Sequence, residues 1–104
     1  MPPRITYPTA IVLLAVSRGV RHGFDIMDAS GLPSGTVYPI LRRLEDAGLM
    51  RSSWEAVTAA RTDGRPPRRY YQVTGPGLRA LEQALERFPG LVRTLGTGDA
   101  PAPA

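Results

Sequence analysis

The chain has 104 residues and a mass of 11.2 kDa, which suffices for one compact domain and excludes a large single-chain enzyme. Its thirteen basic residues are all arginine and, against nine acidic residues, give a net charge of +4 at pH 7. Arginine binds phosphate with a planar, always charged fork, so this set suits an anionic partner, although a GC-rich genome would produce the same composition. Cysteine is absent and histidine occurs once, so we expect no disulfide, metal site or cofactor.

The sequence has no pattern typical of a membrane-bound or exported protein. The longest apolar run, Ala10 to Val16, has seven residues. A membrane span needs about 18. The first ten residues lack the apolar core and cleavage site of a signal peptide. We therefore expect a cytoplasmic protein with no membrane partner.

Two helices are predicted in the first third of the chain. Thr6 can cap the first helix, Pro8 fits its first turn, and Gly19 can terminate it. Residues 11–16 are apolar all round, so this helix should lie buried at the centre of the domain. A second, short helix is expected over residues 23–29, with His22 before it as a capping or packing side chain rather than a pH sensor.

A third helix, from Ser34 to Ala47, is the most informative element. Its apolar residues recur at i, i+3, i+4 and i+7, which predicts one buried face. Because Pro39 is tolerated only near a helix start, Ser34 or Thr36 is expected as the N-cap, and Gly48 should end the helix. The opposite face is predicted to carry hydrogen-bonding side chains beside the helix's positive N-terminal pole: Ser34, Tyr38 and Arg42, with Arg43 on the flank.

Two strands are expected next, over residues 50–57 and 69–73. Between residues 51 and 71 five arginines stand against two acids, and the glycine and prolines among them favour a long, mobile loop over a helix. Tyr71 shares a face with Val73 and should enter the core, whereas Tyr70 points away toward DNA or a partner subunit. Trp54 is expected to pack beneath the loop or to line an effector pocket.

The C-terminal part should form a helix capped by Thr74, with an apolar stripe at spacings of 3 and 4. Such a stripe can pack on its own domain, but we expect it to pair two subunits. Pro89 and Gly90 interrupt the pattern and predict a kink or break, and residues 96–104 are expected to be a disordered tail. The predicted dimerisation residues are Leu78, Leu81, Leu85, Phe88 and Val92.

The order helix, helix, helix, strand, basic loop, strand, helix predicts a mainly α fold with a small β-hairpin, the winged helix-turn-helix. The third helix of such a fold can enter a DNA major groove while the loop reaches phosphates. A protein-binding winged helix is an alternative, but it leaves the arginine-rich loop unexplained. An enzyme with Tyr38, Tyr70 or Tyr71 as nucleophile would need a metal or general base, and no acidic cluster supplies one.

Four strings of the sequence occur in the order and spacing of a known family: HGFDI at residues 22–26, GTVYPILRRLE at 35–45, Gly48-Leu49, and GRP at 64–66 followed by RYY, Thr74 and Gly77. They resemble the PadR family of bacterial transcriptional regulators, over about residues 9–95. Family members often have Tyr and Glu where Phe24 and Asp25 stand. The resemblance implies a dimeric repressor on a palindromic operator, and for some members release by a small aromatic or multidrug-like effector.

Together these observations predict a winged-helix DNA-binding domain over residues 1–74, a C-terminal dimerisation helix over 75–95 and a tail over 96–104. Arg42 is expected to form a bidentate pair with guanine, worth about 1–3 kcal/mol of discrimination, rather than a weak pair with Asp46. The wing arginines are expected to contact phosphates. The predicted DNA-binding residues are Ser34, Thr36, Tyr38, Arg42, Arg43, Arg65, Arg68 and Arg69.

Overall fold

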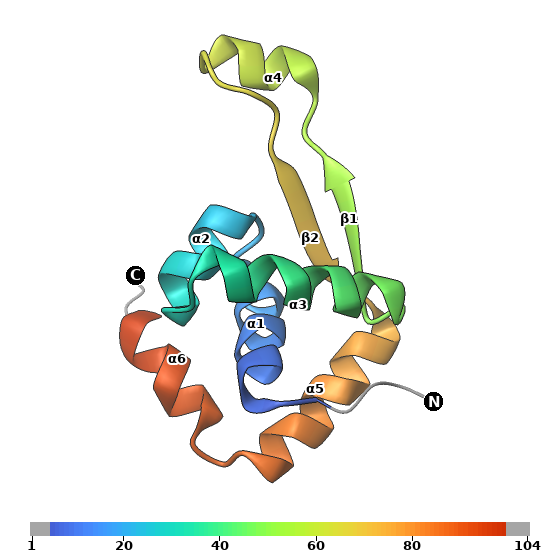
Figure 1. Ribbon diagram of the computed structural model, residues 1–104, viewed down its shortest axis with the longest axis vertical. Coiled ribbons are helices and arrows are strands. Elements are labelled where there is room, and N and C mark those ends of the chain that lie inside the picture. Colours follow the sequence, from blue (N-terminus) through green and yellow to red (C-terminus); the bar gives the residue numbers. More distant parts are fainter. Residues whose placement is uncertain (1–4, 100–104) are drawn as a thin grey trace.

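The computed structural model describes residues 5–99 and confirms the expected mostly helical fold with one antiparallel hairpin (Figure 1). No helix within this range is long and apolar enough to cross a membrane. In chain order the elements are α1 Tyr7–Ser17, α2 Gly23–Ser30, α3 Ser34–Asp46, β1 Met50–Trp54, α4 Val57–Thr62, β2 Arg69–Val73, α5 Gly75–Arg87 and α6 Leu91–Asp99.

Helix α1 occupies the centre, as its all-round apolar sequence predicted. Every residue from Ala10 to Val16 is buried, and α1 contacts α2, α3, α5, α6 and β2 (Figure 1). The Thr6 side chain caps the helix by accepting a hydrogen bond from the Thr9 amide at 3.4 Å. After Arg18 the chain turns at Gly19, whose φ of 96° is in the left-handed region that glycine adopts without strain. The remaining elements therefore pack around this one buried, apolar helix.

Helix α3 buries the predicted face, formed by Val37, Ile40, Leu41 and Leu44. The expected N-cap was wrong: Pro33 precedes the helix, no side chain caps it, and the Val37 amide donates to the Pro33 carbonyl at 3.0 Å. Pro39 consequently lies inside the helix rather than in its first turn. Because proline lacks an N–H, α3 forgoes one internal hydrogen bond there, which the burial of its apolar face outweighs.

The hairpin pairs β1 with β2 in antiparallel register, from Met50 opposite Val73 to Trp54 opposite Arg69. On its other side β2 receives a further bond, because the Tyr71 amide donates to the Arg21 carbonyl at 2.8 Å. Met50 and Tyr71 are buried, which confirms Tyr71 as a core residue and anchors the base of the hairpin. Beyond this base the hairpin projects from the body as a wing (Figure 1).

The upper part of the wing differs from the prediction in two ways. The first strand ends at Trp54 instead of residue 57, and residues 58–62, expected to be loop, belong with Val57 to the short helix α4 at the tip (Figure 1). Ala60 is buried beneath the turn, and its carbonyl accepts the Arg65 amide, so contacts within the tip outweigh the glycine and prolines that follow. Trp54 is 65% exposed and does not pack beneath the wing.

The C-terminal part contains two helices, not one, since the chain breaks between Arg87 and Leu91 as Pro89 predicted. Thr74 caps α5 as expected, accepting from the Gly77 amide at 3.2 Å. Both helices lie against α1, and Leu81, Leu91 and Leu95 belong to the same apolar core as α1. Residues 96–99, expected to be disordered, continue α6, and residues 100–104 lie outside the described residues.

Candidate nucleic-acid interface

The outer face of α3 presents the polar side chains that the sequence predicted. Tyr38 is 46% exposed, and Arg42 and Arg43 are both exposed. Within residues 5–99 neither arginine side chain forms a hydrogen bond or ion pair, so the Arg42–Asp46 pair considered above does not occur. Ser34 is exposed in the first turn, while Thr36 is half-buried. Two cations and a partly exposed tyrosine therefore lie on the outer face of one helix.

The ring of Tyr38 lies directly on the backbone of Gly23, the first residue of α2. A Cβ atom at Gly23 would come within 2.6 Å of Tyr38 Cε1 and 2.7 Å of Cζ, and it would also overlap Oη. Only glycine leaves room for the ring. The HGF string at the start of α2 thus helps to orient a side chain of α3, a role that sequence reasoning missed because helix spacing relates only residues of the same helix.

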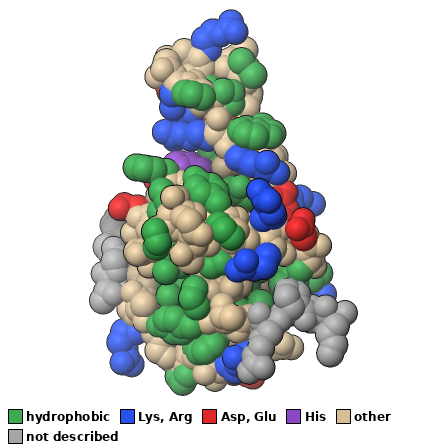
Figure 2. Space-filling view, in the orientation of Figure 1, with side chains coloured by type: hydrophobic (Ala, Val, Ile, Leu, Met, Phe, Trp, Pro, Cys, Tyr) green, Lys and Arg blue, Asp and Glu red, His purple; other side chains and the backbone are tan. Residues whose placement is uncertain are grey.

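A groove runs between α3 and the wing. Tyr38 and Arg42 line it from α3, Phe24 lines it from α2, and the opposite wall comes from the wing. Figure 2 shows arginine side chains from the wing tip down to the level of α3. The wing residues that line the groove are Trp54, Pro67, Arg68, Arg69 and Tyr71.

Glu45, an acidic residue of α3, connects α3 to the wing at the groove. Glu45 pairs with Arg69 of β2 at 3.3 Å, and its Oε2 also accepts a hydrogen bond from the Ser52 hydroxyl of β1. Arg69 Nε donates to Ser52 Oγ at 2.9 Å, and its guanidinium lies over the Trp54 ring, 5.4 Å from the centroid. The predicted phosphate ligand Arg69 is therefore engaged within the chain, where it fixes the wing to α3.

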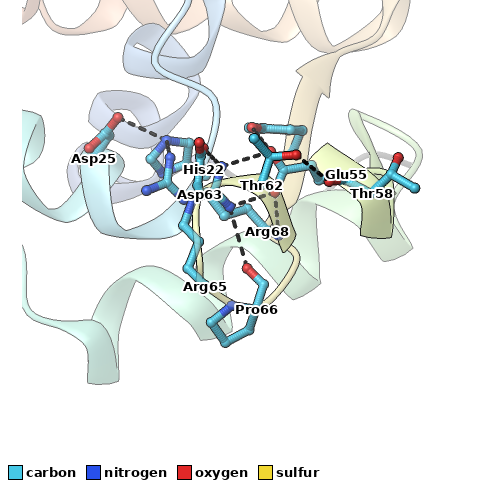
Figure 3. A network of polar contacts seen from close by, with 10 residues as sticks. His22, Asp25, Glu55, Thr58, Thr62, Asp63, Arg65, Pro66 and Arg68 are labelled. Atoms are coloured by element: carbon cyan, nitrogen blue, oxygen red, sulfur yellow. Dashed lines mark hydrogen bonds and ion pairs between the residues drawn. The ribbon is translucent and has the colours of Figure 1, made fainter. Parts of the chain in front are cut away.

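A second acid, Glu55, organises the wing tip (Figure 3). Arg65 binds it with both terminal nitrogens, at 2.6 and 2.9 Å, and also pairs with Asp63 at 3.0 Å. The Arg68 amide and the Tyr70 hydroxyl donate to the same carboxylate at 3.2 Å each. The hydrogen bonds from Arg65 lower the pKa of Glu55 to about 2, and those to Glu55 raise the pKa of Arg65. Arg65 thus holds the tip together, and its side chain is 22% exposed.

The remaining predicted wing residue, Arg68, is exposed and lies at the groove. Its Nη1 is 3.3 Å from His22 Nε2, and the same His22 atom is 3.1 Å from an Asp25 carboxylate oxygen (Figure 3). His22 therefore packs between the start of α2 and the wing, as expected of a packing residue. Arg51 and Arg61, which the sequence reasoning did not select, are exposed and form no ion pair with any residue from 5 to 99.

The predicted dimerisation stripe is divided between core and surface. Leu81 is buried in the core of its own chain, where α5 packs on α1. Leu78 and Val92 are 49% and 42% exposed, while Leu85 and Phe88 are half-buried. Exposed apolar side chains thus remain on both C-terminal helices, and Leu81, which is buried in the core, is not one of them.

A winged helix with an exposed, arginine-bearing third helix beside a basic hairpin belongs to the class of winged-helix DNA-binding proteins. The model of the Transcriptional regulator PadR-like family matches residues 12–83, and the chain belongs to this family. It is therefore a DNA-binding transcription regulator and not an enzyme. No curated protein matches the chain significantly.

Solved structures agree with this assignment. A PadR-like transcription factor from Bacteroides fragilis is 26% identical, with a TM-score of 0.63 over 86% of each chain. A PadR family regulator from Eggerthella lenta is 28% identical, with a TM-score of 0.58 over 88% of this chain and 82% of that one. The protein smu.1704 of Streptococcus mutans is 22% identical and shares the fold, with a TM-score of 0.68 over 100% of this chain and 99% of that one.

Proposed function

We propose that the chain is a homodimeric repressor that acts in the bacterial cytoplasm on a palindromic operator. The observation that carries this proposal is the outward face of α3, where Tyr38, Arg42 and Arg43 are exposed and the two arginines have no ion pair within residues 5–99. Because these two arginines have no internal ion pair, no such pair has to be broken when they bind DNA. The same face carries Ser34 at the N-terminal end.

In the proposed complex α3 lies in the major groove. Arg42 donates to O6 and N7 of a guanine, which contributes about 1–3 kcal/mol of discrimination against the wrong base. Arg43 and the Tyr38 hydroxyl, together with Ser34 and Thr36, contact the base edges or phosphates on either side. Arg68 contacts a phosphate at the groove and supplies affinity that is independent of sequence.

The proposed dimer forms through the C-terminal helices. Leu78 and Val92 supply its exposed apolar surface, and the half-buried Leu85 and Phe88 extend it. A two-fold dimer presents two α3 helices, so the operator is expected to be palindromic, with half-sites about 10 base pairs apart or a multiple of that. Release by a small aromatic or multidrug-like effector rests on the family resemblance and is proposed with it.

The test begins with selection of DNA ligands from a random pool, followed by fluorescence anisotropy on the selected sequence and a scrambled one. We expect Arg42→Ala to abolish most of the preference for the selected sequence while leaving scrambled DNA bound equally well. Arg79→Ala, which removes the same charge from α5, should leave both affinities unchanged. Failure to select any sequence would favour the alternative, a winged helix that binds protein.

The dimer is tested separately by light scattering at micromolar concentration. For the wild-type chain we expect twice the mass of one chain. For the double variant Leu78→Glu with Val92→Glu we expect a monomer, and because both side chains are already exposed, these substitutions should leave the fold intact. A monomeric wild-type chain would contradict the dimer. Repression is tested with a reporter gene placed behind the selected operator, and effectors are sought as compounds that lower the anisotropy.

A further inference from the structure

The wing of this chain ends in a helix, and this shape limits which part of DNA the tip can enter. An α-helix with side chains is about 10–12 Å wide. The minor groove of B-form DNA is about 6 Å wide, so the body of α4, residues Val57–Thr62, cannot be seated in it. The major groove is wide enough, but in the proposed complex α3 already occupies it. The sugar-phosphate backbone is the surface that remains for the tip.

The tip is held in this shape and cannot easily unfold to a thin loop. Glu55 binds Arg65 through two hydrogen bonds and also accepts the Arg68 amide. The Arg65 amide donates to the Ala60 carbonyl at 3.1 Å, and Ala60 is 1% exposed under the helix. If α4 unfolded into a thinner loop that could enter a narrow groove, all of these contacts would be lost together.

The side chains of the tip also disfavour the minor groove. Proteins that read it use arginine, lysine, asparagine or glutamine. Val57, Thr58 and Ala59 are exposed but carry no such group, and Arg65 is bound to Glu55. Arg61, exposed on the last turn of α4, is the one side chain of that kind left for DNA, and with the body of α4 held outside the minor groove it meets the phosphates at the groove edge.

We propose that the helix-tipped wing lies on the sugar-phosphate backbone, contacts a phosphate through Arg61, and reads no base edge in the minor groove. This inference rests on the proposed placement of α3 in the major groove. It means that the sequence preference of the regulator comes from α3, and that the wing adds salt-sensitive affinity of equal size on every sequence.

The first experiment changes only the minor groove of the selected DNA. Inosine in place of guanine removes the N2 amino group, and 2,6-diaminopurine in place of adenine adds one, while the major-groove donors and acceptors of each pair stay the same. With these bases in the segments flanking the α3 half-sites, we expect the wild-type affinity to stay within about twofold. A loss of tenfold or more for either base would overturn the inference.

The second experiment removes the cation. Arg61→Ala should lower the slope of log affinity against log salt by about 0.9 for each protomer, on selected and scrambled DNA alike, because one phosphate contact is lost. The matched control is Arg79→Ala on α5, at the other end of the molecule from α4 (Figure 1), and should leave the slope unchanged. An unchanged slope for Arg61→Ala would overturn the inference.

The controls separate this inference from the proposed function. Trp54 fluorescence verifies that Arg61→Ala keeps a folded wing, since Trp54 is the only tryptophan in the sequence and stands at the base of the tip. If Arg42→Ala loses the sequence preference while the minor-groove bases weaken binding, the proposed function stands and the backbone-bound tip is wrong. If the wild-type chain binds no DNA specifically, the proposed function fails and this inference fails with it.

Discussion

Glu45 in the last turns of α3 and Arg69 at the start of β2 form an ion pair of 3.3 Å, and Ser52 of β1 hydrogen-bonds to both. Helix α3 and the wing beside it are thus linked by side chains and not only by the backbone at Met50. Because Arg69 also stacks on Trp54, a change at either end of this link is transmitted to a fluorescent side chain.

The first prediction concerns this link. Arg69→Gln should remove the cation from the Trp54 ring, shift its emission and increase its quenching by added iodide. Glu45→Gln should change the emission in the same direction but less, since Arg69 keeps its bond to Ser52. The pair is partly exposed, so the free energy of unfolding should fall by only about 0.2–1 kcal/mol. Identical emission spectra for wild type and Arg69→Gln would contradict the observed stack.

The second prediction tests the contact between Gly23 and Tyr38. An alanine Cβ at residue 23 would overlap the tyrosine ring, so Gly23→Ala should displace Tyr38 and lower the free energy of unfolding by about 1–3 kcal/mol. DNA affinity should fall as well, because the hydroxyl leaves its position on α3.

The double variant provides the control. Gly23→Ala combined with Tyr38→Ala removes the ring that the new methyl meets, so this variant should be more stable than Gly23→Ala alone, by thermal unfolding. At Gly35, where no atom lies within 4 Å of an added Cβ, alanine should not destabilise the chain. Equal stability of Gly23→Ala and wild type would show that the ring does not rest on Gly23.

The third prediction concerns pH and the wing tip. Since the pKa of Glu55 is lowered from 4.5 to about 2, the carboxylate contributes its full stability above pH 4.5 and loses it as the pH falls toward 2. The Arg68 amide donates to Glu55, so its proton chemical shift should titrate with a midpoint near 2. Glu55→Gln should abolish this titration, and a midpoint near 4.5 would mean that Arg65 does not hold the carboxylate in solution.

The sequence pattern predicted the structure well for features that depend on residues within a single helix or at its ends. The Thr6 and Thr74 caps, the buried face of α3 and the break at Pro89 all follow from nearest neighbours along a helix, and the structure confirms them. The N-cap of α3 was wrong because Pro39 is tolerated deeper in the helix than propensity alone allows.

The site was harder to predict because it depends on contacts between distant residues. Arg65 and Arg69 have the charge and loop position of phosphate ligands, but Glu55 and Glu45 neutralise them from ten and twenty-four residues away. Nothing in the spacing of the arginines distinguishes those two from the unpaired Arg61. The helix at the wing tip was missed for a related reason, since its buried Ala60 gains its stability from a turn closed by Glu55 and Arg65.

The last prediction concerns Gly77, which follows Thr74 by three residues in the sequence string that resembles the PadR family. A Cβ atom at Gly77 would overlap the Leu49 carbonyl oxygen and come within 2.7 Å of Val73 Cγ1. The Leu49 carbonyl cannot move aside, because it accepts the Thr74 amide at 3.1 Å and lies at the base of the wing. Gly77→Ala should therefore lower the free energy of unfolding by about 3 kcal/mol, the upper part of the range for overpacked sites.

In a domain of this size such a loss corresponds to a fall in Tm of roughly 12 °C or more, measurable by circular dichroism. Gly75→Ala in the same first turn is the matched control, because the Cβ there would meet only the Arg79 side chain at 3.9 Å, an ordinary contact. Its Tm should equal or exceed that of the wild type. Equal melting of the two variants would show that α5 can shift away from Leu49, and that the tight approach at Gly77 is not what fixes α5 against the wing.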